Sequence, residues 1–376
     1  MGNIVLVRQS NKQREVISDK RLKFAILADS GANFINVLAC GLQGMLDKLD
    51  CSSTIFPRGV NLLKREKRRG VHRLSRKISL RNLLVSLEKF DAIIVIDCIP
   101  TAFLKSFQIE SLRQAFPDKP IVLYSNYYLP TRGRWNVWLK NGNKEMGVTE
   151  PGYGMGRYDW YLCSSVVNKY PIVDDRRPYS LIGLNIHYQH DLFPEQNEFI
   201  ALVDFQRDRF LKERQTQLGA LKECNIEFVE LKGRYSIEEI RKIYRRTSIY
   251  FVAHPESFGV PICELQACGA YVCAPFADWC RSHTIKTDLE TYAPGTLTEN
   301  FVIYEDDKEK LIHQLNRIRQ THNPSAVVKT FECNHPQLAH GDLEQLSDFI
   351  EKIERREIHS QSHMNYDDFN VFLPRC

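Results

Sequence analysis

Short runs of consecutive apolar residues alternate with helical patterns, and this alternation restricts the fold more than any other feature of the chain. In the first half such runs cover residues 22–28, 92–96 and 121–124. A strand that is apolar on both faces must be covered on both faces, which happens in parallel sheets flanked by helices. The sequence therefore predicts an α/β fold built on parallel strands.

A polar stretch at residues 187–198 divides this alternation into two series. It carries Pro194 and few large apolar residues, which is typical of a linker between domains. Beyond it, Ser236 and Glu239 form the pattern of a capping box, which marks a helix start. The elements expected there are, in chain order, a strand at 199–205, a helix at 211–224, a strand at 226–231, a helix at 236–246, a strand at 249–253, a helix at 261–268 and a strand at 271–274. Tandem α/β domains of this kind bind ligands at the carboxyl ends of their strands.

Composition excludes several other classes of protein. The chain has 376 residues, of which 43% are hydrophobic and 26% charged, and its net charge is +5. This balance is ordinary for a globular protein. No segment approaches the ~18 apolar residues of a membrane span, and residues 4–7 are too few for the core of a signal peptide. The 11 cysteines form no Cys-x-x-Cys pair, which favours reduced thiols. We therefore expect a soluble cytoplasmic protein.

The segment between the expected strands at 249–253 and 271–274 carries the strongest chemical pattern. Gly259 allows the backbone to approach a ligand, and Pro261 suits the first turn of a helix. The free N–H groups of such a turn form an anion site. Glu256 precedes the turn, and Glu264 lies about one turn inside the helix, where each carboxylate can accept hydrogen bonds from sugar hydroxyls. The pattern suits a sugar diphosphate.

This segment resembles the Glu-x7-Glu motif of retaining glycosyltransferases with the GT-B fold, those of family 4 in particular. Glu256 and Glu264 have the seven intervening residues, and the Gln-Ala-Cys-Gly sequence at 266–269 is similar to the continuation of the motif. The resemblance implies that Glu256 orients the donor sugar and that Glu264 binds the ribose hydroxyls. The other donor-binding residues that it implies here are Ser257, Phe258, Gly259, Val260 and Pro261.

The resemblance also covers the start of the second half. In the family, an Arg and a Lys five residues apart follow the first strand of this domain and bind the diphosphate. Arg207 and Lys212 have this spacing after the expected strand at 199–205. Gln206 replaces the usual glycine, and Arg209 is an alternative to Arg207. The resemblance therefore implies a catalytic role for Arg207 and Lys212, as groups that stabilise the departing diphosphate.

Two glycine-containing loops extend the resemblance. Gly233, Arg234 and Tyr235 resemble the loop that holds the nucleotide base, and a plain turn between a strand and a helix is the alternative. In the first half the match is weaker. There, Gly31 stands where the family brings the backbone close to the donor.

Taken over the whole chain, the resemblance implies two facing Rossmann-like domains in the GT-B architecture and a C-terminal crossover helix. Residues 1–188 would form the acceptor-side domain, residues 189–340 the nucleotide-sugar-binding domain, and residues 341–376 the crossover helix and tail. The implied activity is retaining transfer of a sugar from a UDP- or GDP-linked donor to a glycan or lipid-linked glycan. The resemblance implies no cofactor and no metal. In agreement with this, the chain lacks the Asp-x-Asp motif of metal-dependent GT-A enzymes.

A strongly basic segment in the first half leaves the acceptor open. From Arg58 to Arg81, ten Lys and Arg residues accompany one acidic residue, Glu66. Such runs are often solvated loops. Two more specific functions are possible for such a segment. It could contact an anionic membrane that carries a lipid-linked acceptor, which would place the protein at the inner membrane surface. Alternatively, it could bind a nucleic-acid acceptor. A nucleic-acid-modifying glycosyltransferase and a non-catalytic protein that binds nucleotide sugars or nucleic acid therefore remain as alternatives.

His187 and His190 are spaced in a way that could suit a metal ion. They are three residues apart, and no third histidine and no cysteine lies near them in the sequence. A zinc site needs at least three protein ligands. We therefore expect a solvated pair in the linker rather than a metal site.

Overall fold

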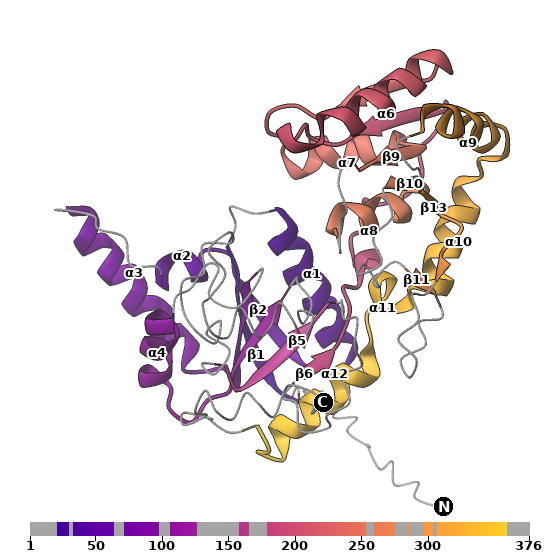
Figure 1. Ribbon diagram of the computed structural model, residues 1–376. Coiled ribbons are helices and arrows are strands. Elements are labelled where there is room, and N and C mark those ends of the chain that lie inside the picture. The colour runs from indigo at the N-terminus through magenta and orange to yellow at the C-terminus, as the bar shows by residue number, and fades with distance from the viewer. Residues whose placement is uncertain are drawn as a thin grey trace, which may run out of the picture.

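The structure is a computed structural model that describes ten stretches of the chain. These are residues 21–29, 33–63, 71–97, 106–125, 158–164, 179–252, 259–274, 284–285, 296–303 and 307–358. The described residues form two parallel sheets, each with helices on both faces (Figure 1). The predicted α/β class, with parallel strands in two domains, is therefore confirmed.

The first domain is built on a six-stranded parallel sheet in the order β2-β1-β3-β4-β5-β6. Its strands are β1 (Lys23–Leu27), β2 (Ser52–Phe56), β3 (Ala92–Asp97), β4 (Ile121–Ser125), β5 (Trp160–Cys163) and β6 (Tyr179–Leu181), and its helices are α1 (Asn33–Lys48), α2 (Gly59–Leu63), α3 (Val71–Leu87) and α4 (Ser106–Ala115). Along β1, Phe24 and Ile26 pack in the same apolar cluster as α1, whereas Ala25 and Leu27 pack with α2, α3 and α4. This burial on both faces explains the continuous apolar runs in the sequence.

The second domain has a five-stranded parallel sheet in the order β13-β10-β9-β7-β8. Its elements are β7 (Ile200–Val203), α6 (Leu211–Glu223), β8 (Glu227–Glu230), α7 (Ile237–Arg246), β9 (Ile249–Phe251), α8 (Val260–Ala267), β10 (Tyr271–Ala274), the pair β11 (Thr284–Ile285) and β12 (Thr296–Leu297), β13 (Phe301–Ile303), α9 (Lys308–Thr321) and α10 (Pro324–Asn334). Helices α6 and α9 cover one face of the sheet, and α7 and α8 cover the other. Ser236 caps α7 by accepting the Glu239 N–H (3.2 Å), and the Glu239 carboxylate accepts the Ser236 N–H (2.8 Å), so the predicted capping box is confirmed.

The chain passes between the domains twice, and the two passages lie side by side. The outgoing passage contains a 3-10 helix, Ile186–Tyr188, and the return passage contains α11 (Pro336–Ala339) and α12 (Leu343–Glu354). The Leu184 N–H donates to the Gln337 carbonyl at 3.0 Å, and the Asp342 N–H donates to the Ile182 carbonyl at 2.8 Å. The two passages therefore form one paired connection.

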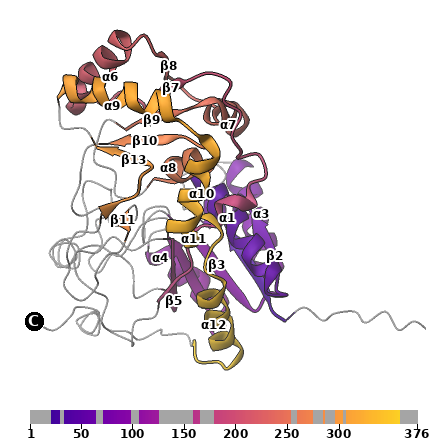
Figure 2. The same ribbon diagram turned by 90° about the vertical axis from the view of Figure 1, so that its right-hand side faces the viewer.

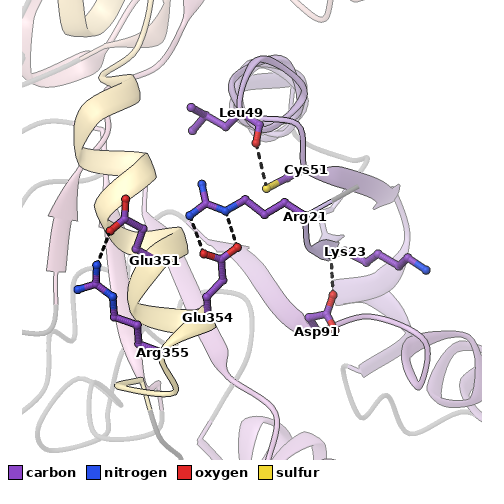
Figure 3. Close-up of polar contacts among 8 residues, drawn as sticks. All are labelled: Arg21, Lys23, Leu49, Cys51, Asp91, Glu351, Glu354 and Arg355. Carbon is purple, nitrogen blue, oxygen red and sulfur yellow. Dashed lines mark hydrogen bonds and ion pairs between the residues drawn. The ribbon is translucent and has the colours of Figure 1, made fainter. Parts of the chain in front are cut away.

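Helix α12 packs on the sheet of the first domain, so the predicted crossover helix is confirmed (Figures 1 and 2). The Phe349 ring lies 6.4 Å from the Phe24 ring and 6.5 Å from the Trp160 ring, measured between centroids. At the end of the helix, the Glu354 carboxylate accepts two hydrogen bonds from the Arg21 guanidinium (Figure 3). The domain boundaries predicted at 188 and 340 fall within the two passages and stay predictions.

Two glycines of α1 allow the outgoing passage to lie directly on this helix. A Cβ atom added to Gly41 would lie 2.1 Å from the Leu184 carbonyl oxygen, and one added to Gly44 would lie 2.2 Å from the Tyr188 ring. Asn185 donates from its side-chain amide to the Gly41 carbonyl at 3.1 Å. The absence of side chains at these two positions sets the distance between α1 and the connection.

The basic segment is mostly helical where the structure describes it. Its described parts are helical, since residues 59–63 form α2 and residues 71–81 lie in α3, while residues 64–70 lie outside the described residues. Of the interpretations of this segment, the loop therefore does not hold for 71–81: Leu80 packs on the domain, as do Leu83 and Leu84 in the next turn of α3, and these contacts hold the helix in place. Over the residues that the structure describes, no helix combines the length and apolar character needed to cross a membrane.

Candidate functional site

A cavity of about 230 Å³ lies between α1 of the first domain and the second domain. The first domain contributes Phe34 and Val37. The second contributes Phe205, which follows β7, Tyr235, which follows β8, and several residues of α7 and α8. Those helix residues are Ile237, Ile240, Arg241, Tyr244, Val260, Pro261 and Glu264. The cavity therefore lies at the carboxyl edge of the second sheet, where α/β folds bind ligands.

Glu264 is the acidic residue of this cavity and is nearly buried, with 7% of its surface exposed. Its Oε1 atom accepts hydrogen bonds from Nε (3.3 Å) and Nη2 (3.2 Å) of Arg241. Within the described residues, its Oε2 atom accepts no hydrogen bond from the protein. Burial raises the pKa of Glu264 to about 7, and the Arg241 guanidinium acts in the opposite direction. The sequence-predicted carboxylate is thus in the cavity, fixed at one oxygen.

Arg241 connects the site to the interdomain passage. Its Nη1 atom donates to Asp191 Oδ1 at 2.7 Å, and its Nη2 atom donates to Gln189 Oε1 at 3.0 Å. Both partners belong to the outgoing passage between the domains. The position of the passage is therefore coupled to the carboxylate in the cavity through one guanidinium.

Arg241 is a site residue that the sequence reasoning missed, although a signal existed. Ile237, Ile240 and Tyr244 all line the cavity, and Arg241 stands at helical spacing among them. A charged residue on the apolar face of a helix requires a buried partner. The presence of an arginine within this apolar pattern could therefore have identified Arg241 as a site residue.

Two aromatic rings form another wall of the cavity. The centroids of the Phe205 and Tyr235 rings lie 6.3 Å apart with an interplanar angle of 56°. The Tyr235 hydroxyl accepts the Lys232 N–H at 3.2 Å, which closes the loop from 232 to 235. Gly233 has φ of +76° in this loop, a conformation that favours glycine. The predicted loop of Gly233, Arg234 and Tyr235 thus borders the cavity through Tyr235, while Arg234 is exposed.

The start of α8 borders the cavity through Val260 and Pro261. Gly259 is the N-cap residue in extended conformation, and no side chain of the described part of the chain caps the helix. Pro261 has no N–H, and the N–H groups of Ile262 and Cys263 donate to the Gly259 carbonyl. The donors that this helix start can offer an anion are therefore the N–H groups of Gly259 and Val260. Glu256, Ser257 and Phe258, and also Gly31 of the first domain, lie outside the described residues.

Arg207 and Lys212 lie on the segment that leaves the cavity at Phe205. Arg207 precedes a short 3-10 turn, Lys212 lies in the first turn of α6, and both are exposed. Neither lines the described cavity. Arg214, further along the same segment, is buried and pairs with Glu230 at 3.0 Å. The diphosphate role of Arg207 and Lys212 stays a prediction.

The expectation of a solvated histidine pair is wrong for His187. Its Nε2 atom is buried and lies 3.1 Å from Oε1 of Glu332 on α10, and its ring stacks on His340. His190, in contrast, is exposed. The sequence reasoning missed these partners because Glu332 on α10 and His340 in the return passage both lie far along the chain from His187.

No protein-family model and no curated protein matches the sequence. Among solved structures, S. aureus MnaA in a co-structure with UDP matches with a TM-score of 0.51 and 8% identity, covering 89% of this chain and 97% of that chain. Arabidopsis thaliana UGT89C1 complexed with UDP-L-rhamnose matches with a TM-score of 0.45 and 13% identity, covering 88% of this chain and 99% of that chain. At this level of identity, the MnaA match shows the fold alone. The chain has two Rossmann-like domains in the GT-B architecture.

Proposed function

We propose that this protein is a retaining glycosyltransferase that moves a sugar from a UDP- or GDP-linked donor to a glycan or lipid-linked glycan. The observation that carries the proposal is the position of Glu264. It lies one turn inside α8, at a cavity between the two domains, with one carboxylate oxygen held by Arg241 and the other without a protein partner among the described residues. Such a carboxylate can accept hydrogen bonds from a ribose diol.

The surrounding groups suit the other parts of a nucleotide sugar. The Phe205 and Tyr235 rings offer a surface for the base, as aromatic faces do. The N-terminus of α8 offers backbone donors to the diphosphate, and the exposed Arg207 and Lys212 lie on the adjoining segment. In this proposal Glu256 orients the donor sugar. The developing negative charge of the leaving diphosphate is stabilised by these cations and donors, without a metal.

UDP is the first nucleotide to test, because MnaA, a protein of the same fold, was solved with UDP. Isothermal titration should compare UDP with 2′,3′-dideoxy-UDP, and both with GDP, in the wild type and in Glu264→Gln. A hydrogen bond to a charged group contributes about 1.5–3 kcal/mol, so we expect the dideoxy analogue to bind the wild type about tenfold to a hundredfold more weakly. In Glu264→Gln this difference should shrink.

A matched control is Glu238→Gln, which removes an exposed carboxylate of α7 that pairs with Lys242. It should retain the wild-type preference for UDP over the dideoxy analogue. An equal preference in Glu264→Gln and wild type would remove Glu264 from the ribose site. Binding of a nucleotide sugar without release of the nucleotide in the presence of acceptors would favour the non-catalytic alternative.

Helix α3 favours a membrane-associated acceptor over a nucleic acid. Ile78 is 54% exposed and Val85 is 57% exposed, and Lys77 and Arg81 are exposed on the same helix. Figure 1 shows α3 on the side of the first domain that is remote from the second domain. Exposed apolar residues next to basic residues suit the surface of an anionic bilayer. We therefore favour a lipid-linked acceptor at the inner membrane surface, with nucleic acid as the alternative.

A further inference from the structure

Two histidines and a glutamate meet where the two interdomain passages lie side by side. His187 belongs to the 3-10 helix of the outgoing passage, Glu332 to α10, and His340 follows α11 in the return passage. One ligand atom from each of the three lies within 4.8 Å of the other two. These groups come together only through the fold.

The contact between His187 and Glu332 has an unusual geometry. The Nε2 atom of His187 lies 3.1 Å from Oε1 of Glu332, yet this buried nitrogen makes no hydrogen bond to any described residue. The buried His187 nitrogen therefore lacks a hydrogen-bond partner among the described residues, while the partly exposed Glu332 carboxylate lies directly beside it. In a tetrahedral zinc site with ligand distances near 2.0–2.1 Å, neighbouring ligand atoms lie about 3.3 Å apart. The observed separation is close to that value.

His340 is positioned to act as the third ligand. The His340 ring stacks on the His187 ring with 5.1 Å between centroids and 24° between planes. His340 is exposed, so its ring can turn a nitrogen toward the other two ligands at little packing cost. Two imidazoles and one carboxylate are a ligand set that zinc uses, with water in the fourth position.

We propose that His187, Glu332 and His340 form a Zn²⁺ site that joins the outgoing and return passages between the domains. Two nitrogen ligands favour a borderline ion such as Zn²⁺ over Mg²⁺ or Ca²⁺, which prefer oxygen ligands. This ion is separate from the donor site, whose chemistry needs no metal in our proposal.

The site gives the ion a mechanical role in the molecule. Gln189, two residues after His187, accepts a hydrogen bond from Arg241 in the cavity. An ion that fixes His187 to Glu332 and His340 therefore fixes the passage that carries Gln189. Bound Zn²⁺ should therefore stabilise the relative arrangement of the two domains that this structure shows.

The test is metal binding to the full chain, with all cysteines kept reduced. Co²⁺ serves as the spectroscopic probe, and Zn²⁺ and Mg²⁺ serve as ligands in isothermal titration and thermal unfolding. We expect one Zn²⁺ per chain, a rise in the unfolding temperature with Zn²⁺ but not with Mg²⁺, and a visible Co²⁺ spectrum without the thiolate charge-transfer band that a cysteine ligand would add. His340→Gln and Glu332→Gln should each weaken Zn²⁺ binding at least tenfold.

The controls separate this site from adventitious binding. His190→Gln removes an exposed histidine three residues from His187, and Cys333→Ser removes the exposed thiol next to Glu332. Both should bind Zn²⁺ like the wild type. Because His340 is exposed, His340→Gln should fold normally, so loss of binding there cannot be attributed to unfolding. Unchanged Zn²⁺ affinity in both His340→Gln and Glu332→Gln would overturn the proposal.

Discussion

The Glu264 carboxylate makes the protein sensitive to pH in the neutral range. Its pKa is raised from 4.5 to about 7, chiefly by burial. Between these values the folded protein holds a proton that the unfolded chain has released. The free energy of unfolding changes with pH in proportion to the protons bound by the unfolded state minus those bound by the folded state. Glu264 therefore makes the protein less stable as pH rises from about 4.5 to about 7.

Donor binding should depend on pH in the opposite direction. The ionised carboxylate is the better acceptor for ribose hydroxyls, and it predominates above the pKa. We expect the affinity for UDP-glucose, whose diphosphate does not titrate in this range, to increase from pH 6 to pH 8. Isothermal titration at pH 6, 7 and 8 measures this. In Glu264→Gln the dependence should be flat, and a profile parallel to the wild type would assign the titration to another group.

Arg241→Met tests the buried ion pair. Removal of one partner leaves the other charge unpaired in the interior, which costs about 3–5 kcal/mol. The loss should be largest at pH 8 and smaller at pH 6, where Glu264 can take up a proton instead. Urea unfolding at both pH values measures it.

The control for this substitution is Lys242→Met, the next residue of the same helix. Lys242 pairs with Glu238 at 2.7 Å, both side chains are exposed, and such surface pairs contribute about 1 kcal/mol or less. Equal losses of stability in Arg241→Met and Lys242→Met would show that the buried pair with Glu264 contributes no more to stability than a surface pair.

The place of Glu264 could be predicted from the sequence because its surroundings are local. The glycine, the proline and the carboxylate lie within six residues, and together they specify a helix start with an acid one turn inside. Its partner Arg241 could not be predicted in this way. The pair exists because α7 and α8 pack on the same face of the second sheet, and no local pattern specifies that contact.

At the scale of elements, Gly41 of α1 gives a clear test. Alanine stabilises a helix interior by roughly 1 kcal/mol relative to glycine. At Gly41, however, a Cβ would lie 2.1 Å from the Leu184 carbonyl, which is backbone and cannot move aside easily. We therefore expect Gly41→Ala to lower the unfolding temperature, despite the better helix propensity.

Gly219→Ala in α6 is the matched control. A Cβ there would lie 3.4 Å from the end of the Lys308 side chain, which is ordinary contact. Thermal unfolding should show Gly219→Ala to be neutral or slightly stabilised. Similar behaviour of the two variants would mean that the outgoing passage does not depend on its contact with α1.

Elements were predictable where their signal is local and missed where it depends on neighbours. The capping box of Ser236 and Glu239 fixes the start of α7 within four residues of sequence. In contrast, β2 reads Ser-Ser-Thr-Ile-Phe and was not predicted. Among the described strands it lies at the edge of the sheet and pairs with β1 alone, so it needs no continuous apolar run.

At the scale of the whole molecule, acceptor and donor belong to different domains in our proposal. Neutralising Lys77 and Arg81 of α3 to Gln should therefore raise KM for an acceptor presented on anionic vesicles and leave donor affinity unchanged. Added salt should mimic the substitutions, since exposed charges are screened over ~8–10 Å. Steady-state kinetics with vesicle-bound, nucleic-acid and soluble neutral acceptors measure the effect. Wild-type kinetics in the double variant at all salt concentrations would show that Lys77 and Arg81 of α3 do not contribute to acceptor binding.

The two-domain organisation could be predicted from the restart of the strand and helix pattern after residue 198. The pairing of the two passages could not. It depends on hydrogen bonds such as that from Leu184 to Gln337, whose members are separated by the entire second domain. Sequence patterns describe elements, whereas this contact arises only once both domains have formed.

Helix α12 also sets an order of events during protein synthesis. Phe24 and Trp160 of the first domain pack against Phe349, which emerges from the ribosome after every residue of the second domain. Domains usually fold in the order in which they are made. Here the first domain to be made is the last to be completed, and its apolar face stays open until α12 arrives. A nascent chain stalled before residue 343 should therefore depend on chaperones, even though its second sheet is already whole.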